Sequence, residues 1–283
     1  KSETALQTLC LKTLFKKANL SPKNVDYLFA GDLESQCTAS AYCMRGFPLQ
    51  FLGLYGACST MALSLGLAST FVASGICKTA VAMTSSHFCT AERQFRTPLD
   101  YGGKRTPTAQ WTVTGAGSVL IGEKAKPPFI KAVTFGKVID YEVTDINNMG
   151  AAMAPAVADT LLHYFADTGN KPSSFDCIYT GDLGEIGSDL LHKMMANEGV
   201  PLPNHKDCGM LIYDLGGQDV GVGGSGCGCG ASVLCGHILN LLQKEKQTRI
   251  LFIATGALMS PITSMQGESI PSIAHLIEIS NDG

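Results

Sequence analysis

The chain carries Gly56-Ala57-Cys58-Ser59-Thr60 between two apolar runs of different character. The run before it, residues 51–55, is typical of a strand, and the run after it, residues 61–74, is typical of a helix that is apolar on nearly all faces. A cysteine at such a strand-to-helix turn lies near unpaired backbone N–H groups and the positive end of the helix dipole. We therefore expect a depressed pKa for Cys58 and a turn that favours thiolates, acyl oxygens and carboxylate ligands. Filling of the core is the alternative role for this cysteine.

Composition narrows the class of protein. The 283 residues are 45% hydrophobic and 16% charged, which suits a compact α/β protein with a large core. The net charge of −3 and the dispersed Lys and Arg residues argue against a nucleic-acid partner. Eleven irregularly spaced cysteines indicate free thiols in a reducing compartment. The nearest approach to a metal-ligand pattern is made by Cys208, Cys227, Cys229 and Cys235. Its Cys-x-Cys pair matches zinc spacing poorly, so we expect no metal and no cofactor.

One uncharged segment raises the question of a membrane span. Residues 46–77 contain no charged side chain and are long enough to cross a bilayer. Proline, glycine and serine residues interrupt the segment, and it divides naturally into a strand, a turn and a buried helix. We expect neither a transmembrane segment nor a signal peptide.

The chain repeats itself at two offsets. At an offset of 150 positions, Leu11, Phe15, Pro22, Asp26, Gly31, Asp32 and Leu33 recur as Leu161, Phe165, Pro172, Asp176, Gly181, Asp182 and Leu183. At an offset of 171 positions, Cys58 aligns with Cys229, and the strand ending at Thr84 aligns with the strand ending at Thr255. We expect two pseudo-symmetric halves, 1–128 and 129–283, each with a mostly parallel sheet. The helices that begin near Cys58 and Cys229 should pack together in the middle.

The two predicted halves differ at their beginnings. The second half opens with a strand over 129–138 that has no counterpart in the first half, so we expect the first half to lack its first strand. The glycine-rich run 221–230 contains Gly-x-Gly-x-x-Gly, which is formally the pattern of a dinucleotide-binding turn. It lacks a suitable strand-to-helix turn before it and a well-placed acidic residue after it. We interpret this run as close backbone packing at the duplicate of the Cys58 turn.

A duplicated α/β half with a cysteine heading its central helix resembles the thiolase-like superfamily, which includes the ketoacyl synthases. A narrower resemblance, to the stage V sporulation protein AD family, rests on FLGLYGACST at 51–60, AERQFR at 91–96, TAQWTVTGAG at 108–117, NNMGAAMAPA at 147–156 and GGSGCGC at 223–229. The superfamily implies a five-layer αβαβα fold. The family implies a component of endospore formers that binds dipicolinic acid, as its calcium complex, for uptake in sporulation and release in germination.

The family resemblance also implies partners and a location. Other stage V A sporulation proteins are the expected partners, and a homodimer is compatible with the resemblance. The protein would be peripheral, on the cytoplasmic face of the forespore or spore inner membrane.

The superfamily's catalytic histidines have no counterpart in the corresponding places. Those places read Thr180-Gly181-Asp182 and Gly224-Ser225-Gly226, and neither supplies an imidazole that could activate a thiol. We therefore expect no catalytic residue, with Cys58 as a vestigial nucleophile position in a binding protein. An acyl-transferring enzyme that uses Cys58 and a purely structural assembly subunit are the alternatives.

The resemblance places the ligand beside Cys58. The expected ligand-binding residues are Cys58, Ser59, His87, Arg93, Arg96, Asp32, Asp182 and Cys229. The loop 87–111 also contains Lys104, Arg105, Phe95, Tyr101 and Trp111, which would supply guanidinium groups and an apolar slot for a flat aromatic dianion. Calcium coordination and helix capping are alternative roles for Asp32 and Asp182. An ion pair with Glu92 or Asp100 is an alternative role for some of the arginines.

Overall fold

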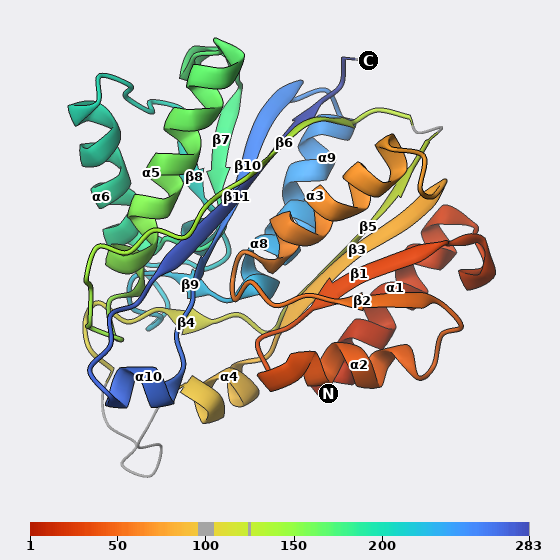
Figure 1. The fold of residues 1–283 in the computed structure, drawn as a ribbon, viewed down its shortest axis with the longest axis horizontal. Helices are drawn as coiled ribbons and strands as arrows, with labels where there is room; N and C mark the ends of the chain where they lie inside the picture. Colours follow the sequence, from red (N-terminus) through yellow and green to blue (C-terminus); the bar gives the residue numbers. More distant parts are fainter. Residues whose placement is uncertain (96–104, 124–125, 283) are drawn as a thin grey trace.

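The computed structural model describes residues 1–95, 105–123 and 126–282. Helices and sheets alternate in five layers (Figure 1). The first sheet has the strand order β2 (Gln50–Gly53), β1 (Tyr27–Gly31), β3 (Thr79–Ser86) and β5 (Gly115–Gly122). The second has the order β6 (Phe129–Phe135), β11 (Ser272–Ser280), β10 (Arg249–Ala257), β7 (Cys177–Thr180) and β8 (His205–Asp207). Each sheet thus takes its strands from one predicted half, while the boundary at residue 128 stays a prediction.

The helices occupy three of the five layers (Figure 1). The outer face of the first sheet carries α1 (Glu3–Ala18) and α2 (Thr38–Met44), and that of the second carries α5 (Met149–Thr168) and α6 (Gly184–Asn197). Between the sheets lie α3 (Thr60–Ala73), α8 (Cys227–Val233) and α9 (Leu239–Gln243), with a π-helical turn at Leu234–Ile238 joining the last two. Shorter elements at one end are α4 (Phe88–Phe95), α7 (Cys208–Leu211), α10 (Pro261–Met265), β4 (Trp111–Thr112) and β9 (Gly224–Ser225). The αβαβα order is the predicted fold class.

Strand pairing confirms the predicted duplication. In the first sheet β1 is parallel to both β2 and β3, and β3 is antiparallel to β5. In the second sheet β7 is parallel to both β8 and β10, and β10 is antiparallel to β11. The repeated aspartates do the same work in both halves, because Asp26 accepts backbone N–H groups from Lys78 and Thr79 and Asp176 accepts them from Thr248 and Arg249. The 150-residue repeat is therefore a structural repeat.

The two sheets differ by one strand. In the second sheet β6 pairs antiparallel with β11 and ends at Phe135, three residues before the predicted end of this strand. Among the described residues, the first sheet has no strand in the equivalent place beside β5. The segment 46–77 forms β2, the turn and α3, and within the described chain no helix combines the length and apolar character that a bilayer crossing requires.

The middle layer explains why the helix after Cys58 is apolar on nearly all faces. One core cluster joins Met61 and Leu65 of α3 with Phe29 of the first sheet and Phe252 and Ile277 of the second. Burial of each such side chain contributes roughly 1.5–3 kcal/mol. Since α3 contacts both sheets, most of its surface is buried, and only its C-terminal part has exposed residues, Thr70 and Ala73.

The second predicted central helix is α8, which begins at Cys227 and therefore near Cys229. Cys58 precedes α3, whereas Cys229 lies inside the first turn of α8. Gly226, at φ 101°, precedes the helix in a conformation that side chains other than glycine rarely adopt. A Cβ on Gly228 would lie 2.5 Å from both the Gly115 oxygen and the Ser86 nitrogen. The glycine run therefore serves close backbone packing, as predicted.

Candidate functional site

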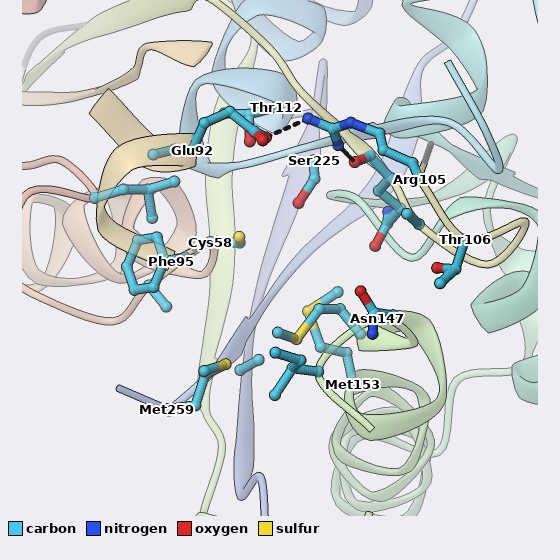
Figure 2. Close-up of a pocket in the computed structure, with 18 of the residues that line it drawn as sticks. Cys58, Glu92, Phe95, Arg105, Thr106, Thr112, Asn147, Met153, Ser225 and Met259 are labelled. Carbon is cyan, nitrogen blue, oxygen red and sulfur yellow. Dashed lines mark hydrogen bonds and ion pairs between the residues drawn. The ribbon is translucent and has the colours of Figure 1, made fainter. Parts of the chain in front are cut away.

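A cavity of about 300 Å³ lies beside Cys58 and is lined from both halves of the chain (Figure 2). Its apolar lining includes Phe95 of α4, Met153 of α5 and Met259, which follows β10. Its polar lining consists of Tyr55, Cys58, Glu92, Arg105, Thr106, Gln110, Thr112, Asn147 and Ser225. In Figure 2 these polar groups and the apolar side chains surround one space. Such a mixed lining suits a small ligand with an apolar body and polar ends.

Hydrogen bonds within the Cys58 turn fix the position of the thiol. The Ser59 hydroxyl donates to the Gly56 carbonyl at 2.6 Å, and the Thr60 hydroxyl donates to the Ala57 carbonyl at 2.7 Å. Ala57 has φ 48°, a left-handed conformation that non-glycine residues seldom adopt outside functional or tightly constrained sites. The turn thus presents the half-buried Cys58 to the cavity while Ser59 and Thr60 remain buried.

The predicted depression of the Cys58 pKa is wrong. Burial of the thiol raises its pKa well above the ordinary value, and the negative charge of Asp182 raises it further. A contact with the Gly226 backbone acts in the opposite direction but is weaker. The thiol is therefore protonated at neutral pH, because desolvation of a thiolate outweighs the favourable helix start.

Asp182 lies directly behind Cys58 and is 1% exposed. Its Oδ2 accepts the Gly226 N–H at 2.8 Å and the Ser225 hydroxyl at 3.3 Å, whereas Oδ1 is buried without a conventional hydrogen-bond partner in the described structure. Burial raises the pKa of this carboxyl to about 7, and the charge of Asp207 adds to the rise, while the hydrogen bond from Cys58 opposes it. Asp182 is thus protonated much more easily near neutral pH than an exposed aspartate would be.

Among the described residues that line the cavity, Arg105 supplies the guanidinium group, and this group already forms an ion pair. It forms an ion pair with Glu92 at 2.5 Å and donates to the Gln110 carbonyl at 2.7 Å (Figure 2). The guanidinium carbon lies 4.3 Å from the centre of the Trp111 ring, which in turn stacks on Phe88 at 4.6 Å. The ion pair with Glu92 was one of the alternatives foreseen from the sequence. These contacts hold the positive charge at one fixed place in the wall.

Most of the other expected ligand-binding residues lie away from the cavity wall. Cys229 is fully buried in α8, and Arg93 is exposed on α4, and neither is among the described lining residues. His87 uses both ring nitrogens, Nε2 on the Lys1 carbonyl at 3.1 Å and Nδ1 on the Cys89 N–H at 3.2 Å. Arg96, like Tyr101 and Lys104, lies outside the described residues.

Asp32 and Asp182 occupy matching places after β1 and β7 but have different roles. Both oxygens of Asp32 are used inside the first half, where they accept the Glu34 N–H at 2.9 Å, the Ser40 N–H at 2.8 Å and the Ser40 hydroxyl at 2.6 Å. Asp32 therefore caps the first turn of α2, which is the capping role foreseen from the sequence. Asp182 instead contacts the start of α8 and the Cys58 thiol.

Sequence reasoning missed several lining residues that lay within the quoted motifs. Gln110 donates from Nε2 to the Asp182 carbonyl at 2.7 Å and to the Gly224 carbonyl at 3.0 Å, so it ties the two halves together. Its Oε1 is buried without a partner in the described structure. Asn147, ahead of α5, also lines the cavity. Both residues belong to long motifs, but no local pattern distinguished them from their neighbours.

The described site contains a thiol without a histidine to act as its base. None of the described residues that line the cavity is a histidine. His205 instead hydrogen-bonds Thr180 at 2.8 Å and His192 at 2.9 Å, away from the cavity, and burial lowers its pKa to about 4. No described group of three or more His, Cys, Asp or Glu side chains is arranged to hold a metal ion. The site can donate and accept hydrogen bonds, but it contains no imidazole to activate Cys58.

Comparisons with known proteins agree with the predicted family and fold. The family model described as stage V sporulation protein AD matches residues 1–280. The stage V sporulation protein AD of Bacillus subtilis is 42% identical over 97% of this chain and 81% of its own length. A solved structure of an OleA variant from Xanthomonas campestris has a TM-score of 0.66 at 11% identity, over 99% of this chain and 82% of that one. The 3-oxoacyl-(acyl-carrier-protein) synthase III of Aquifex aeolicus has a TM-score of 0.59 at 13% identity, over 99% and 85%.

Proposed function

The chain belongs to the stage V sporulation protein AD family, and on that premise we propose that it is a non-catalytic protein that binds dipicolinate in the cavity beside Cys58. A role in sporulation follows from the family itself. The observation that carries the proposal is a cavity beside Cys58, at the place where the superfamily has its nucleophilic cysteine. No histidine is among the described residues of the cavity wall. A site of that kind retains the shape for a small acid while lacking the general base that condensation chemistry needs.

The chemistry of the lining supports a small aromatic diacid. Met153, Met259 and Phe95 offer polarizable apolar surfaces for a flat ring. The Arg105 guanidinium and the Asn147 amide stand on one side of the cavity, and Cys58 stands on the other (Figure 2). The two carboxylates of dipicolinate flank its ring nitrogen, so hydrogen-bond donors on the two sides of the cavity could each reach one of them. In this proposal, a calcium ion would be coordinated by the oxygen atoms of the ligand itself.

The cellular setting is proposed on the family resemblance. We place the protein at the cytoplasmic face of the forespore or spore inner membrane, where it acts with other stage V A proteins in dipicolinate uptake and release. The structure bears on this setting only through the lack of a helix, among the described residues, that could span a bilayer. Co-flotation with membranes that contain the other stage V A proteins, and not with bare vesicles, is the expected behaviour of a peripheral component.

Acyl transfer through Cys58 is the competing function. The thiolase-like fold and the position of Cys58 in a cavity favour it. The raised pKa of the thiol and the lack of a lining histidine weigh against it. Incubation with acetyl-CoA or malonyl-CoA followed by intact-mass measurement separates the two functions. A stable acyl adduct on Cys58 followed by condensation would establish the enzyme.

Calorimetric titration with dipicolinate, with and without calcium, tests the binding function directly. The Cys58→Phe variant should reduce affinity at least about tenfold, because the ring would occupy the ligand's place in the cavity. Its melting temperature should fall by only about 2–4 °C, because the new side chain enters the cavity and the main loss is the contact of the thiol with Asp182. Cys89→Ser, at an exposed cysteine of α4, is the matched control and should bind as the parent does. Parental affinity in Cys58→Phe would place the ligand elsewhere.

A further inference from the structure

The two carboxylate oxygens of Asp182 differ in their hydrogen bonds. Its Oδ2 is satisfied by Gly226 and Ser225, while its Oδ1 is buried and lacks a conventional partner in the described structure. The Cys58 thiol interacts with this carboxyl from the cavity side. A buried carboxylate oxygen without a donor is costly, so this carboxyl is poised to gain either a proton or a stronger donor.

Among the described residues, the titratable groups around Asp182 give it no positive partner. Those that face it are Cys58 from the turn before α3, Asp207 and Cys208 from the β8–α7 junction, and Cys227 and Cys229 from α8. All five are acids. Across the cavity, the charge of Arg105 is paired with Glu92. A second negative charge brought to Cys58 by a ligand would therefore meet an ionised Asp182 without compensation.

The direction of the Cys58 hydrogen bond depends on the state of Asp182. When Asp182 is ionised, the thiol must donate its only hydrogen to the carboxylate, and a sulfur lone pair faces the cavity. When Asp182 is protonated, its O–H can donate to the sulfur, which frees the thiol hydrogen to point into the cavity. Only in the second arrangement can the Cys58 thiol donate a hydrogen bond to a carboxylate of the ligand.

We propose that Asp182 takes up one proton from solvent when the cavity binds a dianion, and that it thereby turns the Cys58 thiol into a donor for the ligand carboxylate. The inference rests on the proposed function and names a proton as the second species that the site takes. The ligand stays a dianion, the proton resides on Asp182, and no covalent bond forms between ligand and protein. Asp182 is thus a positioning residue that sets which charge state of the complex is stable.

The sign of the pH dependence follows from linkage. In the free protein the pKa of Asp182 is raised to about 7, chiefly by burial, and the bound dianion raises it further. Below about pH 6 the carboxyl already holds its proton, so binding takes up little. Above about pH 8 each complex takes up one proton, and affinity falls about tenfold for each pH unit.

Calorimetric titration of the full chain with dipicolinate tests this inference. Runs at about pH 6 and about pH 8.5, each in two buffers of different ionisation enthalpy, measure the number of protons taken up. We expect uptake near zero at the lower pH and near one at the higher pH. An infrared difference spectrum at the higher pH should gain a band of a protonated carboxyl on ligand binding, which provides a second measurement on the parent protein.

Two variants assign the proton to its residue. Asp182→Asn imitates the protonated acid, so it should bind at high pH as tightly as the parent does at low pH and take up no proton. Asp167→Asn removes an exposed carboxyl of α5 that is not among the described lining residues, and it should keep both the uptake and the pH slope. Binding by the parent protein without uptake or pH slope would overturn the inference and leave the proposed function standing. Absence of binding at every pH would overturn both.

Discussion

At the scale of single residues, Cys58 shows how a neighbour from the other half can reverse a local electrostatic argument. The turn before α3 has the geometry that lowers a thiol pKa, since its sulfur lies at a helix start. Burial and the Asp182 charge raise the pKa instead. Asp182 follows β7 in the second half, so its effect depends on the packing of the two halves. The location of Cys58 could be predicted from its own sequence, and its protonation state could not.

A raised pKa makes Cys58 a slow thiol, which alkylation can measure. With iodoacetamide at about pH 8, we expect Cys89 to react at least about tenfold faster than Cys58, because the thiolate is the reactive form and Cys89 is exposed. Peptide mass spectrometry over a time course gives both rates in one sample. Faster modification of Cys58 than of Cys89 would indicate an activated thiolate and would revive the acyl-transfer function.

At the scale of elements, the 150-residue repeat predicted more of the structure than the pattern of any single segment did. The prolines at 22 and 172 each open a short 3-10 turn, and the aspartates at 26 and 176 bind equivalent backbone groups. Such local contacts recur because each half builds them from its own residues. The packing partner of the glycine run escaped prediction, because Gly226 and Gly228 pack against Ser86, which belongs to the other half. The lining residues Gln110 and Asn147 escaped for the same reason, since only the assembled fold brings them to Cys58.

Two glycines of the same helical stretch should respond oppositely to substitution. Gly228→Ala should lower the free energy of unfolding by about 2–4 kcal/mol, because its Cβ would meet backbone atoms of Gly115 and Ser86 that cannot move independently. Gly236→Ala meets nothing within 4 Å and should be neutral or stabilising by up to about 1 kcal/mol. Denaturant unfolding of both variants gives the comparison. Equal effects would mean that α8 does not pack against β3 and β5 as described.

At the scale of the whole molecule, the middle layer decides whether the two halves are separate domains. The core cluster that contains α3 and α8 also contains strand residues of both sheets, such as Phe29 and Phe252. β4 of the first half pairs with β9 of the second, and Gln110 bonds across the same junction. Neither half can bury its inner sheet face without the other. The cavity shares this dependence, because its wall is drawn from both halves.

The shared core predicts one cooperative unfolding transition. For 283 residues at about 0.7 kcal/mol per residue, a single transition should have a van't Hoff enthalpy of about 200 kcal/mol, close to the calorimetric enthalpy. Halves that unfolded independently would give a van't Hoff enthalpy of about half that value. The Gly228→Ala variant sharpens the test, because damage at the interface should shift the whole transition to lower temperature. If differential scanning calorimetry of that variant instead resolved two peaks, 1–128 and 129–283 would be independent domains, and the cavity between them would open without global unfolding.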